Sequence, residues 1–294
     1  KILKELKVPN IVVTGGEPFL RPDIVDIISL LNHYGFSIRL QTNGTLVTEE
    51  KIKALAEAGL KDITISLDTL DEKKFDWICG SNDIVQKVRK SLDIVTGYMT
   101  GFIVVSTVIS RMNISELSEI IRFVNSKGAY ASICPVNLLQ AENKSAFCLG
   151  YSKEMHLSKK DLPEIEKAYE EMLEMKKEGY RIISSTEFLK ASLDYFRTGN
   201  YSWHCKAGEQ FFVIYPDGGV SPCDVFPPLL HIKSDFLKKF RSIEYREKFK
   251  QMREGCDGCM FGCWRETNLF IDDFATQMEQ MKLYLRKKTG THHP

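Results

Sequence analysis

The sequence NIVVTGGEP, at residues 10–18, joins a run of β-branched residues directly to two glycines, a glutamate and a proline. The first half predicts a buried strand at residues 10–13. In parallel α/β folds, ligands meet the carboxyl ends of the strands, and glycines there let a ligand approach the backbone closely. The carboxylate of Glu17 is an acceptor that suits an ammonium group. This stretch therefore predicts a parallel sheet and a ligand site at one strand end.

The same alternation of strand and helix continues along the chain with a repeat of about 25 to 30 residues, as βα units produce. Further strands are expected at residues 37–41, 62–67, 102–108 and 130–134. Helices are expected at residues 22–34, 48–58 and 115–127, with Thr48 and Ser115 as N-caps and Gly35, Gly59 and Gly128 just past their ends. The expected fold class is α/β with a barrel-like sheet.

The second half of the chain changes in character. Residues 158–179 predict an amphipathic helix, and residues 180–184 one more strand. Near Phe188 the composition turns aromatic and cysteine-bearing. We therefore expect two domains, at residues 1–187 and 188–294.

Composition limits the kind of partner. The 40 Lys and Arg residues nearly balance the 39 Asp and Glu residues, and the net charge of +1 gives no general attraction to nucleic acid or to anionic membranes. No run approaches the roughly 20 apolar residues of a membrane helix, and residues 1–7 show no signal-peptide pattern. We expect a cytoplasmic protein.

Five of the eight cysteines lie late in the chain. Cys205 and Cys223 flank a predicted hairpin over residues 211–220, and Cys256-x2-Cys259-x3-Cys263 follows a charged helix. Thiolates from a hairpin and a loop can bind one metal ion or cluster, whereas disulfides are the alternative in an oxidising compartment. A zinc ion held by four thiolates also fits this spacing. The isolated Cys79, Cys134 and Cys148 are expected in the core.

Residues 15–18 resemble the GGEP motif of radical S-adenosylmethionine (radical SAM) enzymes, which holds the amino group of the cofactor's methionine part. Residues 41–44 are similar to the TNG segment of that family. The resemblance implies ribose contacts after the next strand, a methionine contact beyond the following one, and adenine packing after the last. The implied cofactor-binding residues are Gly15, Gly16, Glu17, Pro18, Thr42, Asn43, Ser66, Asp68, Asn113 and Pro135. Taken singly, most of them also read as turn or cap residues.

The late cysteines resemble the opening of the SPASM/twitch domain, through Cys205-x12-Gly218-x4-Cys223. No cysteine follows Cys263, so the resemblance implies one auxiliary 4Fe-4S cluster rather than two. Cys205, Cys223, Cys256 and Cys259 are the first choice of ligands, and Cys263 is the alternative to any of them. The implied architecture is a partial (β/α)6 TIM-like barrel of radical SAM type with a small C-terminal SPASM/twitch cluster-binding domain.

The chain departs from the family in one respect. Radical SAM enzymes resembling it carry Cys-x3-Cys-x2-Cys upstream of GGEP, and this chain has no cysteine before Cys79. We therefore expect the native protein to carry that triad, with a second 4Fe-4S cluster, upstream of Lys1. A degenerate, non-catalytic barrel with a structural zinc site is the alternative.

The resemblance implies an enzyme that generates a 5'-deoxyadenosyl radical for hydrogen abstraction, with flavodoxin or ferredoxin as electron donor. A peptide or protein is the expected substrate, and oxidation or rearrangement of a small molecule is the alternative. No catalytic residue is named by the sequence. An aldolase-like or pyridoxal-dependent barrel lacks support, because no lysine follows a predicted strand at a suitable position.

Overall fold

The computed structural model describes residues 1–136, 154–200, 203–256 and 258–289. The chain divides into two compact units. The first contains Lys1–Cys134 and Glu170–Ile183, and the second contains the described parts of 135–169 and 184–292.

The first unit is built on one sheet with the linear strand order β1-β2-β3-β4-β5. Its strands are β1 (Asn10–Val13), β2 (Ser37–Thr42), β3 (Asp62–Ser66), β4 (Ile103–Ile109) and β5 (Tyr130–Pro135). The first three pairings are parallel and in simple register, with Val13 opposite Leu40 and Thr42 opposite Ile65. The predicted α/β class with a parallel sheet is thus confirmed, as an open sheet. Of the strand predicted at residues 180–184, a single bridge between Ile182 and Ala131 is present.

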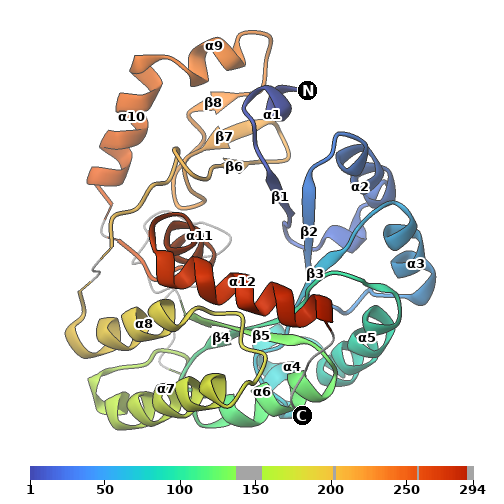
Figure 1. Cartoon of the computed structure of the whole chain (residues 1–294), viewed down its shortest axis with the longest axis vertical. Coiled ribbons are helices and arrows are strands. Elements are labelled where there is room, and N and C mark those ends of the chain that lie inside the picture. The colour runs from blue at the N-terminus through green and yellow to red at the C-terminus, as the bar shows by residue number, and fades with distance from the viewer. Residues whose placement is uncertain (137–153, 201–202, 257, 290–294) are drawn as a thin grey trace. The chain divides into compact units, whose positions relative to one another are not determined.

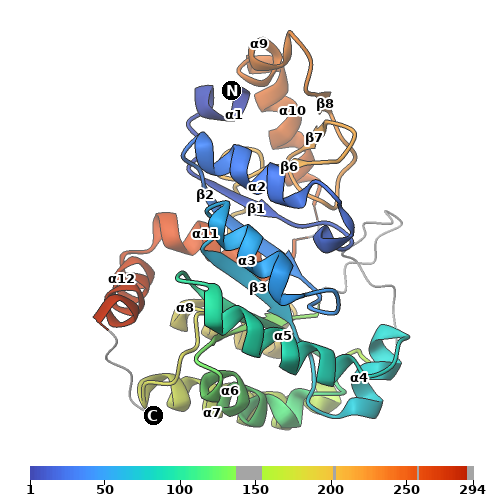
Figure 2. The ribbon, with the colours of Figure 1, turned by 90° about the vertical axis from the view of Figure 1, so that its right-hand side faces the viewer.

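Helices lie between these strands along the chain, and others precede and follow them. They are α1 (Ile2–Glu5), α2 (Ile24–His33), α3 (Glu49–Glu57), α4 (Glu72–Cys79), α5 (Ile84–Tyr98), α6 (Leu117–Ser126) and α7 (Leu162–Lys177), with the short 3-10 helices η1 (Pro18–Leu20), η2 (Ile114–Glu116) and η3 (Lys159–Asp161). Figure 2 shows α2, α3 and α5 side by side along β1, β2 and β3. Fully buried aliphatic side chains such as Ile28, Leu40, Ile52 and Ile65 fill this interface.

Two local expectations have different outcomes. Thr48 caps α3 as predicted, because its hydroxyl accepts a hydrogen bond from the Lys51 amide. The prediction for Ser115 is wrong, since this residue lies inside η2, whose N-cap is Asn113.

Helices α4 and α5 were not expected from the sequence. They are separated by Gly80 and Asp83 in the left-handed conformation, which interrupts the helical period.

The second unit contains a small antiparallel sheet of β6 (Val213–Ile214), β7 (Gly219–Ser221) and β8 (Leu230–His231). Its helices are α8 (Thr186–Thr198), α9 (Phe236–Phe240), α10 (Ile243–Glu254), α11 (Gly262–Asp272) and α12 (Phe274–Thr289). The predicted hairpin and the charged helix before Cys256 are therefore present, as β6-β7 and α10 (Figure 1).

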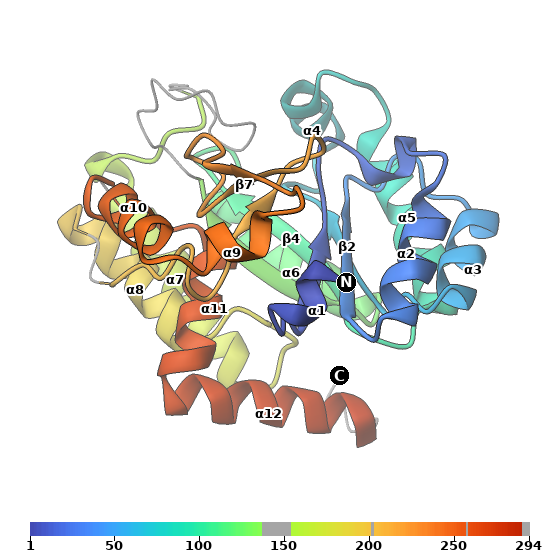
Figure 3. The same cartoon turned by 90° about the horizontal axis from the view of Figure 1, so that it is seen from above.

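Helix α12 follows α11 after a sharp turn of the chain (Figure 3) and bonds through a polar side chain to α8. The Glu279 carboxylate accepts a hydrogen bond of 3.0 Å from the Thr186 amide in the first turn of α8. Glu266, from α11, does the same for the Ser185 amide at 2.7 Å. Two carboxylates thus satisfy free amides at the start of α8, where the helix dipole favours negative charge. In contrast, several exposed side chains of α12 are apolar, among them Phe274, Met278, Met281 and Leu285.

Further sequence expectations concern the three isolated cysteines and the absence of membrane helices. Cys79 is exposed and Cys134 only partly buried, so the prediction that they belong to the core is wrong. Both lie at or near the end of an element rather than in its buried middle. Cys148 lies outside the described residues. Within the described part of the chain, the helices are all too short or too polar to cross a bilayer.

Candidate functional site

The turn after β1 leaves its backbone uncovered. Gly15 and Gly16 are exposed, and a Cβ atom built on either would meet no other atom within 4 Å. Pro18, in contrast, is buried at the start of η1. The paired glycines therefore give a ligand direct access to peptide groups at this strand end.

Glu17 is fixed by three hydrogen bonds. Its Oε1 accepts from the Phe19 amide at 3.0 Å and from the Thr42 hydroxyl at 2.8 Å, and its Oε2 accepts from the Asn43 amide at 2.8 Å. All three donors are neutral, and they come from η1 and from the end of β2. Among the described residues, no cation forms an ion pair with Glu17. The carboxylate is thus held in place while its negative charge stays available to a cationic ligand.

A second group of predicted residues lies at the ends of β3 and β4. Ser66 ends β3 and is exposed. Asp68 follows two residues later, and its Oδ1 accepts a hydrogen bond of 2.8 Å from the Val108 amide. Burial raises the pKa of Asp68 to about 6. The side chain of Asn113 is completely buried and bonds to backbone groups of both strand ends.

The structure therefore brings the predicted residues together in two sets at one edge of one sheet. Hydrogen bonds join Glu17 to Thr42 and Asn43, and others join Asp68 to the segment that contains Asn113. Pro135 is the buried last residue of β5. An anchored carboxylate, open glycine backbone and a second carboxylate are donors and acceptors that fit the ammonium and hydroxyl groups of S-adenosylmethionine.

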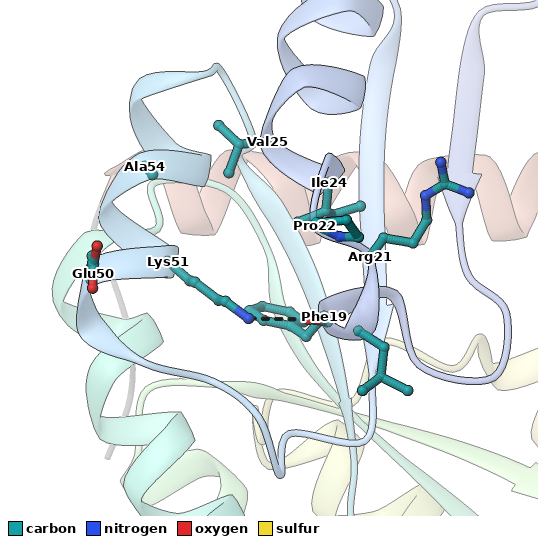
Figure 4. Close-up of a pocket in the computed structure, with 9 residues that line it drawn as sticks. Phe19, Arg21, Pro22, Ile24, Val25, Glu50, Lys51 and Ala54 are labelled. Carbon is teal, nitrogen blue, oxygen red and sulfur yellow. Dashed lines mark hydrogen bonds between the residues drawn. The ribbon is translucent and has the colours of Figure 1, made fainter.

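A pocket of about 420 Å³ lies beside η1, between the starts of α2 and α3 (Figure 4). It is lined by Phe19, Leu20, Arg21, Pro22, Ile24, Val25, Glu50, Lys51 and Ala54. Figure 4 shows Lys51 reaching across to Phe19, whose carbonyl oxygen accepts a hydrogen bond of 3.1 Å from its Nζ. None of the predicted site residues lines this pocket, so it is distinct from the strand-end site.

Four of the late cysteines lie near one another in the second unit. Cys223 is 7% exposed and packs with Ala207, Phe211 and Cys205. Burial, with contributions from the neighbouring Cys205, Cys256 and Asp224, raises the pKa of the Cys259 thiol to about 12. Burial also raises the pKa of Cys205, with a contribution from Cys256, and that of Cys223, with contributions from Asp224 and Cys259. Cys263 is exposed in the first turn of α11.

Buried thiols grouped in this way are candidate ligands for a cation. Thiolates that are buried together repel one another, and a bound metal or cluster relieves that repulsion. Four thiols supply the number of sulfur ligands that an iron-sulfur cluster or a zinc ion needs. In the described residues, no three His, Cys, Asp or Glu side chains are arranged to hold a single metal ion.

Sequence reasoning missed two residues beside these cysteines. The carboxylate of Asp224 accepts hydrogen bonds from the Cys223 thiol at 3.0 Å and from the Trp264 indole at 3.3 Å. Trp264 in turn stacks on Phe211, with ring centroids 4.4 Å apart. The available signal was adjacency, since Asp224 follows Cys223 and Trp264 follows Cys263.

Together these features describe an α/β protein with a candidate ligand site at its strand ends and a group of thiols in its second unit. The model of the radical SAM superfamily matches residues 1–124. This part of the chain is therefore a radical SAM domain.

Solved structures with the same fold extend over nearly the whole chain. Native anSMEcpe with bound AdoMet and Cp18Cys peptide has a TM-score of 0.60 at 18% identity, covering 98% of this chain and 87% of its own. SuiB of Streptococcus suis bound to precursor peptide SuiA has a TM-score of 0.61 at 16% identity, covering 94% and 65%.

Curated relatives match at higher identity but over shorter stretches. The probable GTP 3',8-cyclase of Archaeoglobus fulgidus is 38% identical over 127 residues, which are 43% of this chain and 42% of the relative. The PqqA peptide cyclase of Bradyrhizobium diazoefficiens is 26% identical over 278 residues, covering 88% and 68%. The chain spans less than half the length of the first curated relatives that it matches.

Proposed function

We propose that this chain is the cofactor- and substrate-binding part of a radical SAM enzyme. The observation that carries the proposal is Glu17, which three neutral donors hold beside exposed glycines without a cationic partner in the described residues. When bound, S-adenosylmethionine and a reduced 4Fe-4S cluster supply one-electron chemistry that abstracts hydrogen from a substrate.

Each side chain has a distinct task in this proposal. Glu17 and the backbone of Gly15 and Gly16 bind the ammonium group, while the Asn43 amide and the Thr42 hydroxyl fix the Glu17 carboxylate. Ser66 and Asp68 bind the ribose hydroxyl groups. Pro135 packs on the adenine ring. The protein thereby orients the cofactor, which lowers the entropy cost of the reaction.

The late cysteines hold an auxiliary 4Fe-4S cluster in this proposal, in a domain that begins after residue 187. Cys205, Cys223, Cys256 and Cys259 remain the first choice of ligands, supported by the partly or fully buried positions of all four and by the raised pKa values of Cys205, Cys223 and Cys259. A low-potential protein such as flavodoxin or ferredoxin supplies the electron. We also propose a cytoplasmic location, because thiolates that hold a cluster suit a reducing compartment.

The substrate we propose is a peptide. Support comes from the match to the PqqA peptide cyclase, which covers 88% of this chain, and from structural neighbours described with bound peptides. A small molecule is the second candidate, because the GTP 3',8-cyclases are more similar in sequence, although over about half of the chain.

One experiment tests both the proposed radical SAM activity and the choice of substrate. The native protein, with its own upstream sequence, is purified and reconstituted without oxygen, then incubated with S-adenosylmethionine and dithionite. We expect formation of 5'-deoxyadenosine, and its loss in the Glu17→Ala variant with iron content unchanged. Addition of peptides encoded near the gene, or of GTP, then identifies the substrate by a mass change in one of them. No 5'-deoxyadenosine at full iron loading would refute the proposed activity.

A further inference from the structure

Asn113 is a completely buried polar residue among the predicted site residues. Its side chain has no exposure to solvent, and it lies at the N-cap position of η2, just beyond β4. A buried amide must satisfy its donors and acceptor inside the protein. The partners of Asn113 therefore indicate its role.

All the polar atoms of this side chain bond to backbone. Oδ1 accepts a hydrogen bond of 2.8 Å from the Ser110 amide, and Nδ2 donates to the Asp68 carbonyl at 2.6 Å and to the Val108 carbonyl at 2.8 Å. Both amide hydrogens are thus used within the protein. No donor remains for the methionine part of a nucleotide, which the family resemblance would assign to this residue.

The effect of these bonds is to fix Asp68 at two points. Asn113 holds the carbonyl group of Asp68, and the Val108 amide holds its carboxylate at 2.8 Å. Asn113 also bonds to the Val108 carbonyl, so one side chain connects Asp68 to the residue whose amide holds the Asp68 carboxylate. The neighbouring Thr107 hydroxyl adds a bond of 2.8 Å to the Leu67 carbonyl. The loop after β3 is thereby tied to the end of β4.

A second group of bonds, called here the Lys74 clamp, holds the outer part of the loop after β3. The Lys74 ammonium group bonds to the Glu116 carboxylate and to the Met112 carbonyl, and the Thr69 hydroxyl donates to Glu116. This clamp joins α4 to η2 without touching Asp68. These bonds support the loop backbone even without Asn113. The orientation of Asp68, in contrast, depends on Asn113.

We propose that Asn113 is a positioning residue, which holds the Asp68 carboxylate toward the ribose hydroxyl groups of the nucleotide and makes no contact with its methionine part. This inference rests on the proposed function, because it takes the ligand to be S-adenosylmethionine. It goes beyond that function, because it proposes that Asn113 acts on the nucleotide only by positioning Asp68.

The test compares two uncleaved ligands, S-adenosylhomocysteine and its 2'-deoxyadenosyl counterpart, by calorimetry on the reconstituted native protein. The wild type should bind the ribose compound roughly tenfold more tightly, since a hydrogen bond to a charged group contributes about 1.5 kcal/mol. Asn113→Ala should reduce this ratio toward one. Asp68→Ala should do the same, and the double variant should lose no more than either single variant.

Asn125→Ala is the matched control. The Asn125 amide also bridges backbone, accepting from the Arg181 amide at 2.6 Å and donating to the Arg181 carbonyl at 3.4 Å, but it lies in the last turn of α6 and is remote in sequence from Asp68. This variant should lower the unfolding temperature and keep the full ribose preference. If Asn113→Ala does not fold, Asn113→Asp keeps the volume and the Ser110 bond but loses both donors, and the same ratio is measured.

The outcomes distinguish a failure of the proposed function from a failure of the positioning role of Asn113. A wild type that binds neither compound refutes the proposed function. A wild type that prefers ribose, together with an Asn113 variant that keeps this preference, refutes the positioning role. An Asn113 variant that weakens both compounds equally indicates a direct methionine contact, and it overturns the inference as well.

Discussion

The hydroxyl of Thr42 donates a hydrogen bond of 2.8 Å to Oε1 of Glu17, and this bond connects the end of β2 to the glycine-rich turn after β1. Thr42 is 4% exposed, so the bond is shielded from water. Its Oγ1 also accepts a hydrogen bond from the Gly44 amide at 3.0 Å. One hydroxyl group thus holds both the carboxylate and the turn that follows β2.

Thr42→Val should therefore lower both stability and ligand binding. Removing a buried hydroxyl that makes two hydrogen bonds costs about 1 to 3 kcal/mol. The check is urea unfolding together with calorimetric titration of S-adenosylmethionine into the reconstituted native protein. Thr42→Ser keeps the hydroxyl and should retain binding close to that of the wild type. Equal affinity in the Val variant would show that Thr42 does not position Glu17.

The metal content should depend on four cysteines. Serine substitution of Cys205, Cys223, Cys256 or Cys259 should each remove the auxiliary cluster, because a missing ligand opens a four-sulfur site. Cys263→Ser is the matched control and should keep full iron and sulfide, since Cys263 is exposed whereas the other four cysteines are buried or partly buried. Iron and acid-labile sulfide are measured after anaerobic reconstitution. Zinc without sulfide in the wild type would favour a structural zinc site instead.

The pKa of Asp68 predicts how stability varies with pH. Its value of about 6 in the folded protein lies above the unfolded value of about 3.9, so the folded state binds this proton more tightly. The contribution of Asp68 to stability is therefore largest below about pH 4, falls as the pH rises to about 6, and is constant above. Asp68→Asn should remove this slope and be about 1 to 2 kcal/mol more stable than the wild type at neutral pH. Urea unfolding of both proteins between about pH 4 and pH 8 tests the sign.

A pair of glycine substitutions tests the tight packing behind the strand-end site. Gly44 has a φ of +78°, and a Cβ atom there would lie 2.9 Å from the Ile65 side chain. Gly44→Ala should cost roughly 1 to 3 kcal/mol of unfolding free energy from backbone strain and crowding. Gly97 lies in α5, where an added Cβ atom would meet no other atom within 4 Å, so Gly97→Ala should stabilise by about 0.5 to 1 kcal/mol. Thermal unfolding of both variants decides whether the two shifts have opposite signs.

Much of the sheet was accessible to sequence reasoning. The strand at Asn10–Val13 was predicted with its observed limits, because its β-branched run meets a glycine pair. Helices α2 and α3 were expected to within two residues at each end. Their boundaries carry local signals, such as Thr48 at the N-cap, that do not depend on tertiary contacts.

The contacts between strand ends were beyond such reasoning. Sequence placed Glu17 and Asn43 at two strand ends, but the 2.8 Å bond between them depends on the register of β1 and β2. Asn113 was expected to face a ligand, whereas its amide bonds to three backbone groups. Asparagine near a helix start gives the same pattern whether it caps, binds or braces, and the partners of its side chain separate these roles.

The arrangement of α12 has a chemical consequence. Met278 and Met281 of this helix are 38% and 55% exposed, and oxidants convert such thioethers to polar sulfoxides. The carboxylate of Glu279, which bonds to the first turn of α8, does not take part in that reaction. Exposure to air should thus change the surface character of this helix and leave its attachment to α8 intact. Each oxidised methionine would be visible as the mass of one added oxygen atom.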